Sequence, residues 1–153
     1  MIQTGKSRTT GGLQIRLASK AEVARFFRTV VRTRMRTGTM LLSEDRLALA
    51  DECFVATVDG RIVGANCLVF DTGDGSELST EYVLREFQGE GIGTQLTRAG
   101  IERLIALGRT PIHVDVASAG MDRTLDRLPR KDRRYLRLKR SYLKYGEVEM
   151  PEK

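Results

Sequence analysis

Alternating apolar and polar residues open the part of the chain that predicts regular structure. Leu13, Ile15 and Leu17 are separated by polar residues, and a period of two is typical of a strand with one buried face. Residues 1–12, which precede this strand, are polar and rich in glycine and threonine. We therefore predict a flexible tail over 1–12 and a strand directly after it.

A helix is predicted to follow. Ser19 and Glu22 stand three residues apart and form a capping box, which opens helices. The apolar residues of the next turns fall on one side of this helix: Val23, Phe26, Phe27, Val30 and Val31. Arginines fall on the other side: Arg25, Arg28, Arg32 and Arg36. This arginine face is either a solvated helix surface or a docking surface for an anionic partner.

A β-hairpin is predicted where two runs rich in β-branched residues, 53–58 and 61–70, flank Asp59-Gly60. With a two-residue turn, Cys53 faces Asn66, and Cys67 points to the opposite side of the sheet. We therefore expect no disulfide between the two cysteines.

The remaining elements follow from the same periodicities. The pattern predicts a short helix over 44–51, a strand over 77–84 and a helix over 92–107 that ends at Gly108. It also predicts a strand over 111–116, a basic helix over 133–143 and an edge strand over 147–150.

Composition adds limits to this picture. Hydrophobic residues make up 41% and charged residues 30% of the 153, which suits one globular domain, placed here at 13–150. No run approaches the roughly 18 apolar residues of a membrane helix, and the N-terminus lacks the apolar core of a secretory signal. We expect a cytoplasmic protein with no membrane partner.

Cys53 and Cys67 lack CxxC spacing, and His113 is the one histidine, so we expect no metal site.

The net charge of +6 is unevenly distributed. Residues 1–46 contain 10 Lys/Arg and 3 Asp/Glu, residues 47–119 contain 5 and 11, and residues 120–153 contain 11 and 6. An acidic middle between basic ends fits nucleic acid, an anionic membrane surface or a phosphorylated small molecule as partner. Charge alone does not choose among them.

Residues 83–94 carry the clearest chemical signal. Gly89, Gly91 and Gly93 lie between a predicted strand and the start of a long helix. Such a turn directs backbone N–H groups to one spot, where the helix end adds about half a positive charge. Gly89 and Gly91 would let a phosphate reach the amides, and Gly93 would let the helix pack close to the strand. The segment predicts an anion site; the alternative is a turn that only connects strand to helix.

The glycine spacing indicates the kind of anion. A dinucleotide fingerprint needs glycine at Thr94, and a Walker loop needs a Gly-Lys pair, so neither fits. The remaining pattern is Q/R-x-x-G-x-G/A, formed by Gln88, Gly91 and Gly93. It resembles the coenzyme A pyrophosphate loop of the GNAT superfamily of N-acyltransferases. The order of predicted elements over 13–146 is similar to that superfamily as well.

The resemblance implies an α/β (α+β) single domain. Its mixed, mostly antiparallel sheet is flanked by helices, and splayed strands form a coenzyme A cleft. The backbone near Val83 and Arg85 would contact the pantetheine arm of acetyl-CoA, the implied donor. The pyrophosphate would lie against Gln88, Gly89, Glu90, Gly91, Ile92, Gly93 and Thr94.

Transfer of an acetyl group to an amine needs a proton acceptor for the ammonium and a proton donor for the departing thiolate. Glu81 is the candidate acceptor, because it stands where the apolar alternation predicts Leu or Ile. Glu77, on the same face by the period of two, is its competitor. The alternative is that Glu81 is a strand-end carboxylate paired with an arginine.

The pattern Y-x-x-x-G formed by Tyr142 and Gly146 is similar to a family segment whose tyrosine hydroxyl protonates the coenzyme sulfur. Tyr135 and Tyr145 are alternatives, and a tyrosine used only for packing remains open. An asparagine that family members often carry after the strand at 111–116 is missing, and Ser118 is a candidate replacement.

The resulting hypothesis is an acetyl-CoA-dependent N-acetyltransferase that acts on a primary amine by direct attack. The acceptor would be a small molecule or a protein, and the arginine face would suit one that is anionic or attached to RNA. Many members of the superfamily continue into a final strand that closes the acceptor pocket, so here the pocket would be open or completed by a second subunit of a homodimer. The alternative is a non-catalytic module of the same fold whose basic helices hold nucleic acid or a partner protein.

Overall fold

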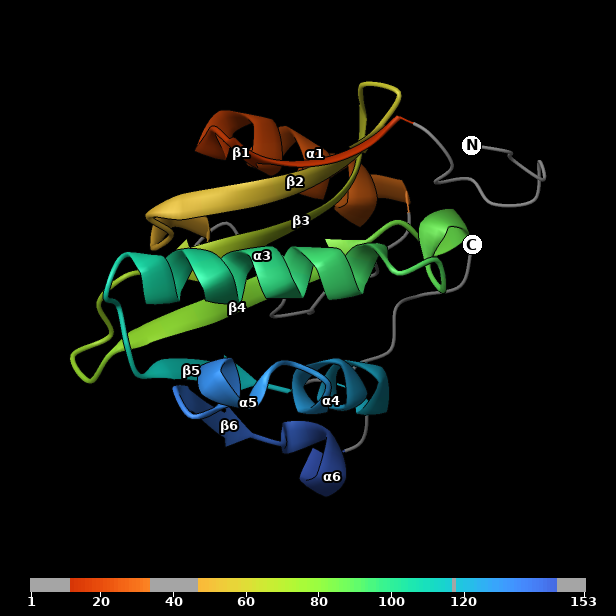
Figure 1. Ribbon diagram of the computed structural model, residues 1–153. Coiled ribbons are helices and arrows are strands. Elements are labelled where there is room, and N and C mark those ends of the chain that lie inside the picture. The colour runs from red at the N-terminus through yellow and green to blue at the C-terminus, as the bar shows by residue number, and fades with distance from the viewer. Residues whose placement is uncertain (1–11, 34–46, 117, 146–153) are drawn as a thin grey trace.

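Six strands form one mixed sheet in the computed structural model, which describes residues 12–33, 47–116 and 118–145. They are neighbours in chain order (Figure 1): β1 (Leu13–Ala18), β2 (Glu52–Val58), β3 (Arg61–Val69), β4 (Ser76–Val83), β5 (Ile112–Asp115) and β6 (Leu136–Lys139). The first four pair antiparallel, whereas β5 runs parallel to both of its neighbours. The expected mixed, mostly antiparallel sheet is confirmed.

Helices cover both faces of this sheet. α3 (Ile92–Ala106) lies across β3 and β4, and α1 (Lys20–Thr33) lies on the opposite face near β1 and β2 (Figure 1). The shorter helices follow β5 or flank β6: α4 (Ala119–Asp126), α5 (Arg130–Arg133) and α6 (Ser141–Tyr145). In the described part of the chain, no helix has both the length and the apolar character needed to cross a membrane.

The core consists of two apolar clusters. The larger one joins α1, through Val23, Phe26 and Phe27, to β2, β3 and the first turns of α3. The smaller one joins the middle of α3 to β5 and α4. Close contact with α3 depends on glycine at two positions. A Cβ at Gly100 would lie 2.8 Å from Leu78 Cδ1, and one at Gly64 would lie 3.1 Å from Leu96 Cδ1.

The hairpin forms as predicted, but the register expected for its cysteines is wrong. The pairing shifts by one residue between Ala56 and Thr57, so Cys53 pairs with Cys67 rather than with Asn66. A bulge of this kind cannot be read from the turn sequence, because it depends on packing along the strands. Both thiols are free and buried, with their sulfur atoms 3.7 Å apart.

The prediction of a basic helix over 133–143 is also wrong. Leu136 and Leu138 are half-buried beside β5, whereas Arg137 and Lys139 point to solvent, so this segment follows the period of two and forms β6. The apolar surface of β5 overrides the helical propensity of the arginines. The strand predicted over 147–150, residues 1–11 of the predicted tail and residues 44–46 of the helix predicted over 44–51 lie outside the described residues. Of the remaining part of that helix, residues 47 and 48 are helical.

The capping box predicted at the start of α1 is confirmed on both sides. The Glu22 amide donates to Ser19 Oγ at 3.1 Å, and the Ser19 amide donates to Glu22 Oε1 at 3.2 Å. Replacing Ser19 by Ala should therefore lower the free energy of unfolding by about 1 kcal/mol, or roughly 3 °C in Tm. Ser19→Thr, which keeps the hydroxyl, is the control in thermal unfolding followed by circular dichroism. Equal Tm values for the two variants would contradict the assignment.

Candidate active site

A bulge in β4 sets the geometry of the candidate site. Between the pairs Ala65–Tyr82 and Cys67–Ser79, β3 contributes one residue and β4 contributes two, Thr80 and Glu81. Thr80 has a left-handed backbone conformation, with φ of 49°. Such a bulge bends the strand and reverses the alternation of side chains beyond it.

The bulge separates Glu81 from Glu77. Glu81 faces α3, where it contacts Thr97, while Glu77 lines a pocket with Leu49 and Ser79 on the opposite face of the sheet. The prediction that the two carboxylates share a face is wrong, because a strict period of two does not hold through Thr80. Only Glu81 remains next to α3.

β4 and β5 part next to the bulge. They pair from Ser76–Ile112 to Leu78–Val114, and β4 then continues to Val83 without a further partner on that side among the described residues. The edge of β4 that faces β5 is thus open where the splayed cleft was predicted. An extended ligand can add to such an edge through its amide groups.

A tight loop connects β4 to α3. It begins with the single turn η2 (Arg85–Phe87), and the Gln88 side-chain amide donates to the Val83 carbonyl at 2.8 Å. Gly89 and Gly91 have φ values of 84° and 86°, and a Cβ at either would meet no atom within 4 Å. Gln88 therefore closes the loop, and both glycines border open space.

The loop leads directly into the N-terminus of α3. Gly91 is the N-cap, and the first intrahelical bond runs from the Gln95 amide to the Gly91 carbonyl at 3.1 Å. The amides of Ile92, Gly93 and Thr94 therefore have no acceptor within the helix, which is the arrangement that binds anions. We call residues 88–94 the cradle.

The prediction that Gly93 is needed for α3 to pack close to the strand is wrong. A Cβ there would lie 3.8 Å from Glu81 Oε2 and 3.9 Å from Val83 Cγ2, which is ordinary contact. Gly64 and Gly100 are the glycines that allow α3 to approach the sheet.

α4 lies directly beside the cradle. Thr94 Oγ1 and Thr124 Oγ1 are 3.2 Å apart, which joins the first turn of α3 to α4. Ser118, the candidate replacement for the missing asparagine, accepts a hydrogen bond from the Met121 amide and caps α4. Its hydroxyl thus has a structural partner in this molecule.

Glu81 belongs to a small polar cluster beneath the first turns of α3. The Thr97 hydroxyl lies 2.9 Å from Oε2, and Asn66 Nδ2 donates to Oε1 at 3.2 Å. Burial raises the pKa of Glu81 to about 7, against the two hydrogen bonds, which favour the carboxylate. No arginine pairs with Glu81 in the described part of the chain, in contrast to the alternative considered from sequence.

Asn66 completes this cluster at full burial. Its Nδ2 also donates to the Leu96 carbonyl at 2.9 Å, while its Oδ1 has no partner among the described residues. The cluster therefore joins β3, β4 and the first turns of α3, directly below the cradle.

Tyr142, the candidate proton donor, lies on α6. Its hydroxyl donates to Asp122 Oδ2 on α4 at 2.8 Å, and Arg140 Nε donates to the same oxygen at 2.8 Å. These bonds lower the pKa of Asp122. Tyr142 is therefore connected to the cradle through α4. Tyr135 contacts Arg134 instead, and the Tyr145 side chain lies outside the described residues.

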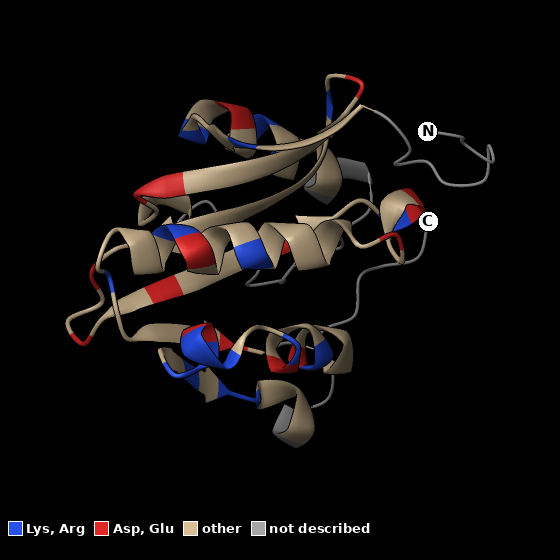
Figure 2. Ribbon diagram, in the orientation of Figure 1, with Lys and Arg blue, Asp and Glu red and all other residues tan. Residues whose placement is uncertain are grey.

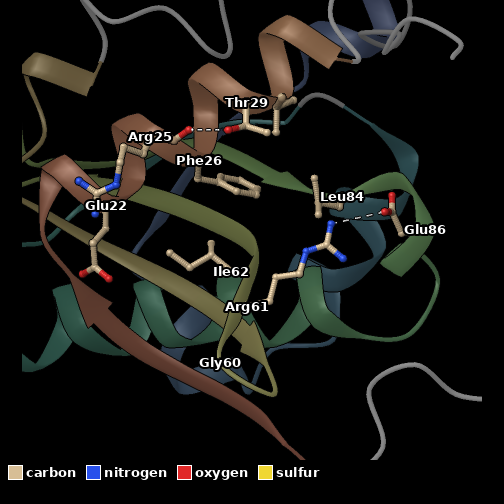
Figure 3. A pocket seen from close by; sticks show the side chains of 10 residues that line it. Glu22, Arg25, Phe26, Thr29, Gly60, Arg61, Ile62, Leu84 and Glu86 are labelled. Carbon is tan, nitrogen blue, oxygen red and sulfur yellow. Dashed lines mark hydrogen bonds and ion pairs between the residues drawn. The ribbon is translucent and has the colours of Figure 1, made fainter.

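A pocket of about 570 Å³ opens on the other face of the sheet, between α1, the hairpin turn and the end of β4 (Figure 3). Its inner wall is apolar, formed by Phe26, Val30, Ile62 and Leu84. The charged residues around it are Glu22, Arg25, Arg61 and Glu86, and Arg61 Nη2 lies 3.7 Å from Glu86 Oε2. Leu84 and Glu86 directly precede the cradle, so pocket and cradle meet at the same end of β4.

The family follows from a sequence comparison. The model of the acetyltransferase (GNAT) family matches residues 22–124, which include β2 to α3 and most of α4. The chain belongs to the GNAT acetyltransferase family. Membership supports transfer of acyl groups from coenzyme A in general, and it confirms the resemblance seen in the glycine loop. No significant match was found among curated protein sequences.

Solved structures of GNAT acetyltransferases share the fold. The IAA acetyltransferase of Bacillus cereus is 17% identical, with a TM-score of 0.59 over 74% of this chain and 73% of that one. YhbS of Escherichia coli, in complex with CoA, is 19% identical, with a TM-score of 0.58 over 73% and 67%. A Bacillus subtilis acetyltransferase in complex with CoA is 20% identical, with a TM-score of 0.58 over 74% and 73%. At these identities the likeness concerns the fold alone.

Three residues of the site in this GNAT chain, Asn66, Thr97 and Thr124, were not predicted from the sequence. Asn66 and Thr97 are polar residues within apolar periodicities, the same signal that singled out Glu81, but their contact depends on the bulge. Thr124 gave no signal, because its contact with Thr94 joins helices that are distant in sequence.

The raised pKa of Glu81 predicts a pH-dependent stability. Between its ordinary pKa of 4.5 and about 7, the unfolded chain loses the proton that the folded chain keeps, so stability falls as pH rises through this range. Glu81→Gln stays neutral and escapes this loss. Between pH 4.5 and 7 the variant should gain about 2 kcal/mol in free energy of unfolding relative to wild type, which corresponds to a relative rise in Tm of roughly 6 °C.

Thermal unfolding at several pH values tests this prediction. Glu77→Gln, an equivalent change on the opposite face of the same strand, is the matched control. A difference between Glu81→Gln and wild type that stays constant from pH 4.5 to 7 would show that Glu81 titrates normally in the folded protein.

Proposed function

We propose that the protein is an N-acetyltransferase that transfers the acetyl group of acetyl-CoA to a primary amine. The observation that carries the proposal is the cradle, which combines three helix amides that have no acceptor within the helix with two left-handed glycines beside open space. A pyrophosphate matches this arrangement, because it presents acceptor oxygens and negative charge to oriented N–H groups. The open edge of β4 offers backbone groups to the amides of a pantetheine arm.

The acceptor amine would approach from the pocket on the α1 face. An apolar wall formed by Phe26, Ile62 and Leu84 suits the body of a small molecule. Charges of both signs surround it, with Arg25 and Arg61 beside Glu22 and Glu86. This mixture favours a small polar amine over a polyanion such as RNA.

Direct attack requires two proton movements. The ammonium loses a proton, the amine nitrogen then bonds to the thioester carbon, and the carbon–sulfur bond breaks to release a thiolate that takes up a proton. Glu81, with a pKa of about 7, is the candidate proton acceptor. Because it faces α3 while the pocket lies on the α1 face, the proton would reach it through water. Tyr142 is the candidate donor to the sulfur, and Asp122 fixes its hydroxyl in the structure described here.

Acetyl-CoA binding is the first test. In millimolar excess the ligand should raise Tm by several degrees through linkage. Gly91→Glu should abolish the shift, because it places a carboxylate where the pyrophosphate would lie. Gly73→Glu is the matched control: Gly73 also has positive φ and open surroundings, but it lies in the loop before β4.

The outcomes are distinct. A shift in Gly73→Glu and none in Gly91→Glu supports the cradle. An equal shift in both variants shows that coenzyme A binds elsewhere. No shift in wild type contradicts the enzyme proposal and favours the non-catalytic module.

Turnover tests the catalytic assignment. Release of free coenzyme A thiol is measured with a panel of small amines and peptides. With an accepted amine, Tyr142→Phe should lower kcat by about 100-fold, as loss of a general acid does, while the KM for acetyl-CoA changes little. Tyr135→Phe is the control, and a loss confined to that variant would move the role to Tyr135.

A further inference from the structure

One face of α4 is basic and adjoins the cradle. Thr124, which contacts Thr94, shares this face with Gly120, Arg123 and Arg127, since residues three or four apart lie together on a helix. Both arginines are exposed, and Arg123 Nη2 would lie 3.9 Å from a Cβ at Gly120. The guanidinium of Arg123 therefore lies along the exposed side of α4 rather than against the core.

Arg98 adds a third positive charge from α3. It is exposed and stands four residues after Thr94 in the helix. Helical side chains tilt toward the N-terminus, so Arg98 leans toward the turn that carries Thr94. Arginines of both α3 and α4 thus lie near the contact between Thr94 and Thr124.

These three arginines have no acidic partner within 4.0 Å in the part of the chain that the structure describes. The acid on the opposite side of α4, Asp122, is held by Arg140 and Tyr142. Figure 2 shows Lys and Arg concentrated on α5 and β6, whereas α4 carries charges of both signs, including the exposed Asp126. From 119 to 143 the sequence has nine Lys/Arg and three Asp. The basic residues therefore outnumber the acidic ones beside the cradle, although Asp126 adds one exposed negative charge at the end of α4.

Coenzyme A carries negative charge at two places. The pyrophosphate is one, and the 3′-phosphate on the adenosine ribose is the other. A pyrophosphate in the cradle would leave the adenosine end outside the sheet, beside the first turn of α3 and the last turn of α4, which meet at Thr94 and Thr124. Arg127 follows Thr124 by three residues, about 4.5 Å along the helix, so its side chain can reach a group bonded a few atoms beyond the pyrophosphate.

We propose that Arg123 and Arg127, assisted by Arg98, bind the 3′-phosphate of coenzyme A and so make this enzyme discriminate coenzyme A from 3′-dephospho-coenzyme A. The inference rests on the proposed function, because it requires the pyrophosphate to lie in the cradle. Arginine suits the task, since its planar guanidinium donates two parallel hydrogen bonds to a phosphate.

Isothermal titration calorimetry with coenzyme A and 3′-dephospho-coenzyme A tests this inference. Wild type should bind coenzyme A about 10-fold more tightly, as expected for partly solvated charge-assisted contacts, and the preference should shrink as salt increases. In Arg123→Ala/Arg127→Ala most of the preference should be lost, because the affinity for coenzyme A falls while that for 3′-dephospho-coenzyme A is unchanged. Arg98→Ala should reduce the preference in part.

Lys131→Ala/Arg133→Ala is the matched control. It removes two exposed positive charges from α5 and should keep the wild-type preference. If this variant loses the preference equally, the effect is one of overall charge and the assigned subsite is wrong.

Three results are decisive. Equal affinity of wild type for both ligands overturns the inference while the proposed function stands. Equal weakening of both ligands in Arg123→Ala/Arg127→Ala also overturns it, since the arginines would then act on the shared part of the molecule. Absence of binding for either ligand to wild type refutes the proposed function itself.

Discussion

Thr80 adds a residue to β4 that β3 does not match, and it adopts a left-handed conformation to do so. The bulge bends β4, which has already parted from β5 after Leu78. It also turns Glu81 toward α3 and leaves Glu77 on the other face. The polar cluster beneath α3 depends on this one irregular pairing, which lies where the edge of β4 toward β5 is already open. A regular β4 would place Glu81 on the face opposite Thr97.

Charge in this molecule is divided between backbone and side chains. The middle of the chain is acidic, yet the cradle within it is electropositive, because helix amides rather than lysines face the open space. Glu81 lies just below these amides, and its pKa of about 7 keeps much of the carboxyl neutral near neutral pH. A fully ionised group there would oppose an anion in the cradle. The arginines of α4 and α3 stand to one side, where they can act on a more distant phosphate.

In the proposed reaction, donor and acceptor would reach the end of β4 from opposite faces of the sheet. The cradle is formed where β4 meets α3, whereas the apolar pocket lies on the α1 face and shares Leu84 and Glu86 with the segment leading to the cradle. The cradle and the pocket therefore both border the end of β4. α4 joins this centre through Thr124 on one side and holds Tyr142 through Asp122 on the other.

Local sequence determined most elements and the chemical character of the loop. The capping box at Ser19, the Asp59-Gly60 turn and the glycines at 89 and 91 are short-range signals, and each forms the structure that its residues predict. Tertiary structure alone decided the two bulges, which pair Cys53 with Cys67 and turn Glu81 toward Thr97. It also made a strand of residues 136–139, since β5 offers an edge that a helix cannot use. These outcomes depend on pairing between distant segments, whose free energy comes from packing and hydrogen bonds that no local pattern records.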